Sequence, residues 1–280
     1  MRSVAEPYAE IIGDPVWHSR SPAIHLSWLR SLAMAGDYRA TRVSREELAA
    51  YLASRRADPS WRGCNVTAPL KQAVLPLLDG LDPAAERIGA VNCIVPEGAR
   101  LVGYNSDVDG VRAALSGAQV TGARVVVIGA GGAARAAITA LSADGAATIR
   151  ILARDVRKGE QLLPLAPQLL EIGPFTEAEA ALSGACAILN ATPLGSAGAE
   201  PMPRPLLDAL AGAAPGATAL DMVYAPLETQ YLRAARAAGL APVDGLTMLT
   251  AQARRAFQLF FGDPPPPGDE ALRALLAALD

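Results

Sequence analysis

Three small residues are spaced as in loops that bind nucleotide phosphates. Gly129, Gly131 and Ala134 fit the pattern G-x-G-x-x-A, directly after an apolar run at 124–128 and directly before an alanine-rich helix. The first glycine permits a tight turn, the second lets the backbone approach a pyrophosphate, and the third small residue lets helix and strand pack closely. The helix start offers free amides to the phosphates. The pattern predicts a dinucleotide site formed by Gly129, Ala130, Gly131, Gly132, Ala133 and Ala134.

Charged residues after the next expected strand bear on which dinucleotide is bound. Arg154, Arg157 and Lys158 offer cations for a ribose 2′-phosphate, and Arg154 adds a planar fork. Asp155 favours the free ribose hydroxyls of NAD. Two opposite unit charges about 4 Å apart attract by roughly 4 kcal/mol at an effective dielectric near 20. Two well-placed cations therefore outweigh one aspartate that points away, which predicts NADP, with NAD as the alternative.

The elements that would position this loop read as a parallel sheet. Continuous apolar runs at 124–128, 148–152, 186–190 and 218–222 each follow a helix-like segment. Such runs are typical of strands that are covered on both faces, and their alternation with helices predicts βαβ units. Helices are also expected at 246–261 and 269–279, separated by a proline turn at 264–267.

The first hundred residues show a second pattern of short strands and helices. Strands are expected at 9–13, 63–67, 90–95 and 100–104, the last two as neighbours across a turn. Ser21-Pro22 predicts a helix start with Ser21 as the cap, and Ser44 with Glu47 predicts a capping box. Pro69 is expected to begin a helix that carries Lys71. The chain is therefore predicted to be an α/β protein of two domains, one with a mixed sheet and one with a Rossmann-like parallel sheet.

Composition narrows the class of protein further. The chain has 280 residues, a net charge of −3 and 51% hydrophobic residues, so bulk charge suggests no nucleic-acid partner. The three cysteines have no paired spacing and the two histidines lie away from them, so no metal site is expected. The segment at 1–7 has no apolar core of a signal peptide, and no run is long enough to span a bilayer. A cytoplasmic location with no membrane partner is the expectation.

Seven short segments, in this order, carry a resemblance to one family. They read GDPVWHSRSP at 13–22, NVTAPLK at 65–71, GAVN at 89–92, NSDVDG at 105–110, NATP at 190–193, DMVY at 221–224 and DGLTMLTAQ at 244–252. Together with the glycine loop, they resemble shikimate dehydrogenases over essentially the whole chain. Seven spaced motifs in one order make the joint match highly specific.

The resemblance implies a reaction and a division of the chain. It implies reversible, NADP-dependent reduction of 3-dehydroshikimate to shikimate, a step of aromatic amino-acid biosynthesis. Residues 1–106 and 245–280 would form the substrate-binding domain and residues 107–244 the NAD(P)-binding domain, with the active site in a cleft between them. The protein would act as a monomer or homodimer on this small-molecule substrate.

The resemblance also implies a role for individual residues. Lys71 and Asp107 would flank the reacting hydroxyl: Lys71 either takes its proton or stays charged and steadies the alkoxide while Asp107 orients it. A polyhydroxylated acid has few apolar atoms, so its recognition relies on directional hydrogen bonds. The implied substrate-binding residues are Ser19, Ser21, Asn65, Thr67, Asn92, Tyr224 and Gln252, and the further cofactor-binding residues are Arg154, Asp155, Lys158, Thr192, Met222 and Gly245.

Three positions depart from the family pattern. Ser106 stands where threonine is usual, Pro193 where serine is common, and Ala153-Arg154-Asp155 where Asn-Arg-Thr is usual. Asp155 therefore favours a rival within the family, an NAD-dependent quinate/shikimate dehydrogenase. A second rival, a dinucleotide-binding sensor without turnover, is disfavoured because a sensor needs neither Lys71 nor Asp107.

Overall fold

The computed structural model describes residues 6–268 and 270–278 and divides into two compact units. Unit 1 comprises the chain up to Ser106 together with Gln252 onward, and unit 2 comprises Asp107–Ala251. The predicted boundary at Gly245 is the first residue of helix α11, and the compact units divide inside that helix. Residues 1–5 of the N-terminal segment, and the predicted helix ends at Asp269 and Leu279, lie outside the described residues.

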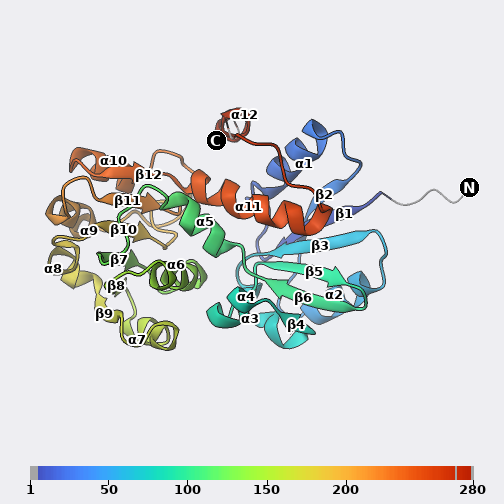
Figure 1. Ribbon diagram of the computed structural model, residues 1–280, viewed down its shortest axis with the longest axis horizontal. Coiled ribbons are helices and arrows are strands. Elements are labelled where there is room, and N and C mark those ends of the chain that lie inside the picture. Colours follow the sequence, from blue (N-terminus) through green and yellow to red (C-terminus); the bar gives the residue numbers. More distant parts are fainter. Residues whose placement is uncertain (1–5, 269, 279–280) are drawn as a thin grey trace, which may run out of the picture. The chain divides into compact units, whose positions relative to one another are not determined.

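Unit 1 is built on a mixed sheet (Figure 1). Its elements are β1 Tyr8–Gly13, α1 Ser21–Ser31, β2 Asp37–Arg42, α2 Leu48–Arg56, β3 Trp61–Val66, α3 Leu70–Ala73, the 3-10 turn Leu75–Leu77, β4 Gly80–Leu81, α4 Pro83–Ile88, β5 Cys93–Glu97, β6 Arg100–Tyr104, the second part of α11 Gly245–Phe261, and α12 Glu270–Ala277. The strand order is β2-β1-β3-β5-β6-β4. The pairs β1–β2, β1–β3 and β4–β6 are parallel, whereas β5 runs antiparallel to β3 and β6.

Unit 2 is built on a sheet in which all strands are parallel (Figure 1). Its elements are α5 Asp107–Ala114, β7 Arg124–Ile128, α6 Gly132–Ala143, β8 Thr148–Ala153, α7 Val156–Glu160, the 3-10 turn Leu163–Leu165, β9 Leu170–Pro174, the 3-10 turn Phe175–Glu177, α8 Ala178–Leu182, β10 Ala187–Asn190, α9 Arg204–Asp208, the 3-10 turn Ala209–Gly212, β11 Thr218–Asp221, α10 Gln230–Ala237, β12 Ala241–Val243 and the first part of α11. The order is β12-β11-β10-β7-β8-β9.

The core of unit 2 explains why its strands read as apolar runs. Val125, Val126, Val127 and Ile128 are all fully buried although alternate side chains of a strand point to opposite faces. Val126 and Ile128 belong to an apolar cluster with residues of α8, α9 and α10, while α6 contacts β7 and β8. Both faces of β7 are therefore covered, and the predicted α/β class with one mixed and one parallel sheet is confirmed.

Two local predictions have contrasting outcomes. The capping box is confirmed, because Ser44 N–H donates to Glu47 (2.8 Å) and Glu47 N–H donates to Ser44 Oγ (3.3 Å) ahead of α2. The prediction that Ser21 caps α1 is wrong. Ser21 is already the first helical residue, Arg20 occupies the cap position without a side-chain cap, and Ser19 Oγ accepts from Ser21 N–H at 3.2 Å. The helix begins one residue earlier than predicted, so Ser21 lies within its first turn.

Candidate functional site

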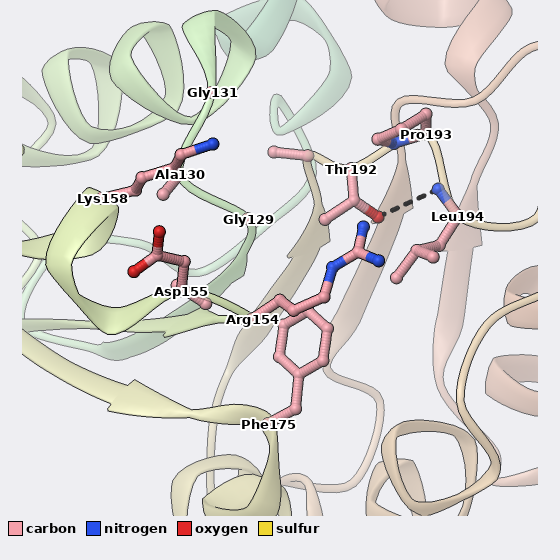
Figure 2. Close-up of a pocket in the computed structure, with 12 residues that line it drawn as sticks. Gly129, Ala130, Gly131, Arg154, Asp155, Lys158, Phe175, Thr192, Pro193 and Leu194 are labelled. Carbon is pink, nitrogen blue, oxygen red and sulfur yellow. Dashed lines mark hydrogen bonds between the residues drawn. The ribbon is translucent and has the colours of Figure 1, made fainter. Parts of the chain in front are cut away.

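A pocket of about 390 Å³ opens where four strands of the unit 2 sheet end (Figure 2). It is lined by Gly129, Ala130, Gly131, Ala153, Arg154, Asp155, Lys158, Phe175, Ala191, Thr192, Pro193 and Leu194. These residues follow β7, β8, β9 and β10. The chain leaves β7 for β8 on one side and later returns to β10 on the other, which makes the β7–β10 gap a topological switch point. Open parallel sheets bind ligands at such points, beyond the carboxyl ends of their strands.

The glycine loop meets the geometric demands predicted for it. Gly129 has φ +118°, and a Cβ there would lie 2.8 Å from Thr192 Cγ2, so no larger residue fits. Gly131 is exposed beside the pocket, and a Cβ there would have no atom within 4 Å. Ala134 is fully buried in α6, whose first residue is Gly132. The turn therefore keeps the Gly131 backbone open to a ligand while α6 packs closely against the sheet.

Buried hydrogen bonds hold the loop on the other side of the pocket. Asn190 Oδ1 accepts from the Thr192 hydroxyl (2.6 Å) and N–H (3.1 Å), and Thr192 Oγ1 accepts from Leu194 N–H (3.2 Å; Figure 2). Asn190 Nδ2 in turn donates to Asp221 at 2.9 Å. Burial raises the pKa of Asp221, although the Thr229 hydroxyl donates to it at 2.6 Å. This series of buried hydrogen bonds fixes the positions of Thr192 and Leu194.

The charged rim of the pocket divides into two arrangements. Asp155 accepts from Arg157 N–H at 3.1 Å and so caps α7, while its carboxylate remains exposed beside Lys158 (Figure 2). Arg154 Nη1 contacts Glu200 at 2.9 Å, and both side chains are about 70% exposed. Glu200 is absent from the predicted site residues. The Glu200 carboxylate forms an ion pair with the Arg154 guanidinium, the group that was expected to bind a 2′-phosphate.

A buried polar cluster lies in unit 1. Asn65 Oδ1 accepts from the Tyr38 hydroxyl at 2.6 Å, and Asn65 Nδ2 donates to the Asn92 carbonyl (3.2 Å) and to Cys93 Sγ (3.2 Å). Burial raises the pKa of the Tyr38 phenol, and the Ser21 hydroxyl lies close enough to oppose that rise. Buried polar side chains are usually hydrogen-bonded, and these partners come from α1, β2 and β3 and from the segment leading into β5.

The cluster continues through Ser106 to the C-terminal helix. Asn92 Oδ1 accepts from Ser106 N–H at 2.8 Å, and Asn92 Nδ2 donates to Ser106 Oγ at 3.1 Å. Ser106 Oγ donates to Gln252 Oε1 at 3.3 Å. Three of the predicted substrate-binding residues, Asn65, Asn92 and Gln252, are thus linked within unit 1, with Ser106 between Asn92 and Gln252 and with Tyr38 between Asn65 and the neighbouring Ser21 hydroxyl. Neither of these two linking residues was predicted as part of the site.

The remaining predicted residues of unit 1 flank this cluster. Thr67 N–H donates to Ile12 O at 2.9 Å, which seats Thr67 just beyond the end of β3. Lys71 is half-buried in α3, and its carbonyl accepts from Val91 N–H at 2.8 Å, next to Asn92. Ser19 is half-buried before α1. The backbone therefore places Thr67 and Lys71 on segments that pair with those bearing the cluster.

The other predicted residues belong to unit 2. Asp107 is the first residue of α5, is 7% exposed, and directly follows Ser106 in the chain. Met222 N–H donates to Asn190 O at 3.0 Å, which ties the segment after β11 to the pocket loop. A Cβ on Gly245 would lie 2.5 Å from Val223 O, so close backbone packing requires this glycine. Tyr224 is half-buried.

Sequence reasoning missed part of the pocket lining, namely Ala153, Phe175, Ala191, Pro193 and Leu194. Ala191, Pro193 and Leu194 neighbour the predicted Thr192, so the position of the loop at a strand's carboxyl end was a usable signal. Phe175 directly follows β9, a strand that was not predicted. Conversely, Gly132, Ala133 and Ala134 belong to α6 and do not line the pocket.

The described residues were also searched for metal-binding groups and for membrane-spanning helices. Among residues 6–268 and 270–278, no three or more His, Cys, Asp and Glu side chains gather as a metal ion would require. Within the same ranges, every helix is too short or too polar to cross a membrane.

Comparisons with known proteins identify the family. Residues 11–94 match the family model of the shikimate dehydrogenase substrate binding domain, and residues 112–196 match that of shikimate / quinate 5-dehydrogenase. A shikimate dehydrogenase (NADP(+)) from Sphingopyxis alaskensis is 48% identical over 280 residues, covering 98% of each chain. The chain belongs to the shikimate dehydrogenase family. The resemblance read from the seven motifs is thereby confirmed.

Solved structures in this family share the fold over nearly the whole chain. The shikimate 5-dehydrogenase from Thermus thermophilus, in complex with NADP(H) and shikimate, is 36% identical with a TM-score of 0.83, over 96% of this chain and 99% of that one. A quinate dehydrogenase from Corynebacterium glutamicum in complex with NAD is 29% identical with a TM-score of 0.85, over 98% and 99%. The family therefore includes members that differ in substrate and cofactor.

Proposed function

We propose that the chain catalyses the reversible, NADP-dependent reduction of 3-dehydroshikimate to shikimate. The observation that carries this proposal is the buried cluster of Ser21, Asn65, Asn92 and Gln252 in a member of this family. Amides and hydroxyls are costly to bury unless they are paired. A ligand with several ring hydroxyls and a carboxylate is the kind of molecule that such donors and acceptors recognise.

Lys71 and Asp107 are the residues to which we assign the proton transfer. Bound NADP would supply the nicotinamide that exchanges a hydride with the ring carbon. When shikimate is oxidised, the hydroxyl on that carbon must also lose its proton. A positioned amine and carboxylate can carry out this proton transfer. Lys71 either takes this proton or remains charged and steadies the oxygen, with Asp107 orienting its amine.

The pocket in unit 2 fits the dinucleotide. Its volume lies within the range of cofactor sites, and Gly129 and Gly131 leave their backbone open where a Cβ would either collide or stand in the ligand's way. Arg154 and Lys158 supply positive charge at the rim, against Asp155. The S. alaskensis relative is named as an NADP(+) enzyme. We therefore infer that NADP is preferred over NAD.

Initial rates with shikimate and with quinate, each with NADP+ and with NAD+, test the function. The expected result is the highest kcat/KM for shikimate with NADP+. Fastest turnover of quinate with NAD+ would instead support the quinate/shikimate dehydrogenase alternative. Cofactor binding without reduction in the presence of either acid would indicate the sensor.

Asp155→Asn is expected to raise the ratio of kcat/KM with NADP+ to that with NAD+ by about five- to tenfold. The change removes a negative charge beside the expected 2′-phosphate, and the exposure of the side chain keeps the effect well below the value for a buried pair. Asparagine caps helices as well as aspartate does, so the bond to Arg157 N–H is retained. An unchanged ratio would show that Asp155 does not face the phosphate.

Glu200→Gln is expected to lower the KM for NADP+ roughly two- to threefold and to leave that for NAD+ unchanged. Only NADP carries a 2′-phosphate that would compete with Glu200 for Arg154, and an exposed ion pair contributes at most about 1 kcal/mol. Glu228→Gln is the matched control, since Glu228 pairs with Arg236 on the surface. Equal shifts for both cofactors would exclude competition at Arg154.

The cellular setting forms part of the proposal. Cys64, Cys93 and Cys186 are all free thiols, as is usual in a reducing compartment, and we infer a cytoplasmic enzyme. We further infer that it acts as a monomer or homodimer on small-molecule substrates.

A further inference from the structure

We propose that Tyr38 is a positioning residue for the substrate: its phenol fixes the amide of Asn65. The inference rests on the proposed function, since it concerns how one of the expected substrate-binding residues is held. Tyr38 itself is 2% exposed and belongs to none of the seven motifs.

The sheet register explains how Tyr38 reaches Asn65. Strand β1 separates β2 from β3, and Ala9 on β1 pairs with both Tyr38 and Gly63. Asn65 lies two residues beyond Gly63, on the same face of the sheet. The small side chain of Ala9, which pairs with Tyr38, leaves room for the Tyr38 ring to lie across β1. Its hydroxyl then meets Asn65 Oδ1 at 2.6 Å.

The ring is held in this direction from behind. The imidazole of His25 stacks on it with ring centroids 4.1 Å apart and an interplanar angle of 5°. His25 is fully buried and is in turn packed against Trp28, Phe257 and Phe260. These aromatic contacts hold the Tyr38 ring in place, with its hydroxyl against Asn65 Oδ1.

The phenol determines the orientation of an amide that would otherwise have two. With the Tyr38 hydroxyl donating to Oδ1, the NH₂ of Asn65 must face the Asn92 carbonyl and Cys93 Sγ. Burial raises the pKa of Tyr38, so the phenol remains a donor over the working range. Removing the hydroxyl would leave Asn65 Oδ1 without this partner, and the amide would then adopt other orientations in the site.

Tyr51 provides a matched control within the same unit. Its hydroxyl donates to Glu10 at 2.9 Å, so Tyr51→Phe also deletes one internal hydrogen bond of a tyrosine. Glu10 is otherwise bonded to Arg55 and Thr41 and is not among the expected site residues. The two phenylalanine variants therefore differ in whether the lost hydroxyl reaches the site.

The experiment compares Tyr38→Phe with Tyr51→Phe. Tyr38→Phe is expected to raise the KM for shikimate roughly tenfold, with kcat and the Kd for NADP+ changed less than about threefold, in line with the loss of one buried hydrogen bond. Tyr51→Phe is expected to leave all three values near those of the wild type. An unchanged KM in Tyr38→Phe, or an equal rise in both variants, would overturn the proposal.

A second measurement decides the matter independently of turnover. The side-chain NH₂ resonances of Asn65, assigned by their loss in Asn65→Asp, are expected to shift and broaden in Tyr38→Phe but not in Tyr51→Phe. Unchanged Asn65 resonances would overturn the positioning role even if the wild-type protein reduced no shikimate-derived ketone. A wild-type protein that shows no turnover would count against the proposed function alone.

Discussion

Replacing Lys71 by alanine is expected to lower kcat roughly a thousandfold while the Kd for NADP+ changes less than about twofold. The amine is the group to which the proton of the reacting hydroxyl is assigned, whereas the dinucleotide pocket is lined by unit 2 residues only. Steady-state rates with shikimate and titration of the protein fluorescence with NADP+ measure the two quantities separately.

The neighbouring Gln72 supplies the control for this loss. Gln72 is exposed on the same helix, α3, so Gln72→Ala tests disturbance of the helix without touching the chemistry. Its rates are expected to match those of the wild type. Parallel losses of turnover and cofactor affinity in Lys71→Ala would show that Lys71 is structural.

Acidification from pH 6.5 to 4.5 is expected to lower the free energy of unfolding by about 2 kcal/mol through His25 alone. Burial lowers the pKa of His25 from 6.5 to about 3. Between these values the unfolded chain binds a proton that the folded protein does not, so stability falls as the pH falls. The contribution is fully present above pH 6.5. Urea unfolding at a series of pH values measures the slope.

His25→Phe is expected to remove this part of the pH dependence. Neither ring nitrogen of His25 has a hydrogen-bond partner within the described chain, and a phenyl ring preserves the stack on Tyr38. His18→Gln serves as the control for the replacement of a histidine, because His18 is exposed. A slope that persists unchanged in His25→Phe would assign the acid sensitivity to other groups.

The strands that are covered on both faces of their sheet were the elements best predicted from the sequence. The runs of β7, β8, β10 and β11 were recognised because covered strands are apolar throughout. Strand β2 was missed because it lies at the edge of its sheet, where DYRATR shows only Tyr38 as a buried residue. An edge strand with charged side chains does not carry the apolar pattern by which strands are recognised.

In the candidate site, features set by the local sequence were predictable, whereas contacts between distant segments were not. The glycine loop was predictable because one local turn dictates its residue types, as the positive φ of Gly129 shows. The partners Tyr38 and Glu200 were not predictable, because each meets its site residue through folding of distant segments. Ser21 illustrates both: a local rule assigned it the cap position, whereas folding places its hydroxyl beside Tyr38.

Unit 1 is built from two separate stretches of the chain, which affects the order in which its contacts can form during synthesis on the ribosome. Gln252 is translated 146 residues after its hydrogen-bond partner Ser106, whereas the parallel sheet of unit 2 has all its strands once Val243 has been added. Domains generally fold as units while the chain emerges. A nascent chain therefore contains every strand of unit 2 before Gln252 can bond to Ser106 and complete the polar cluster of unit 1.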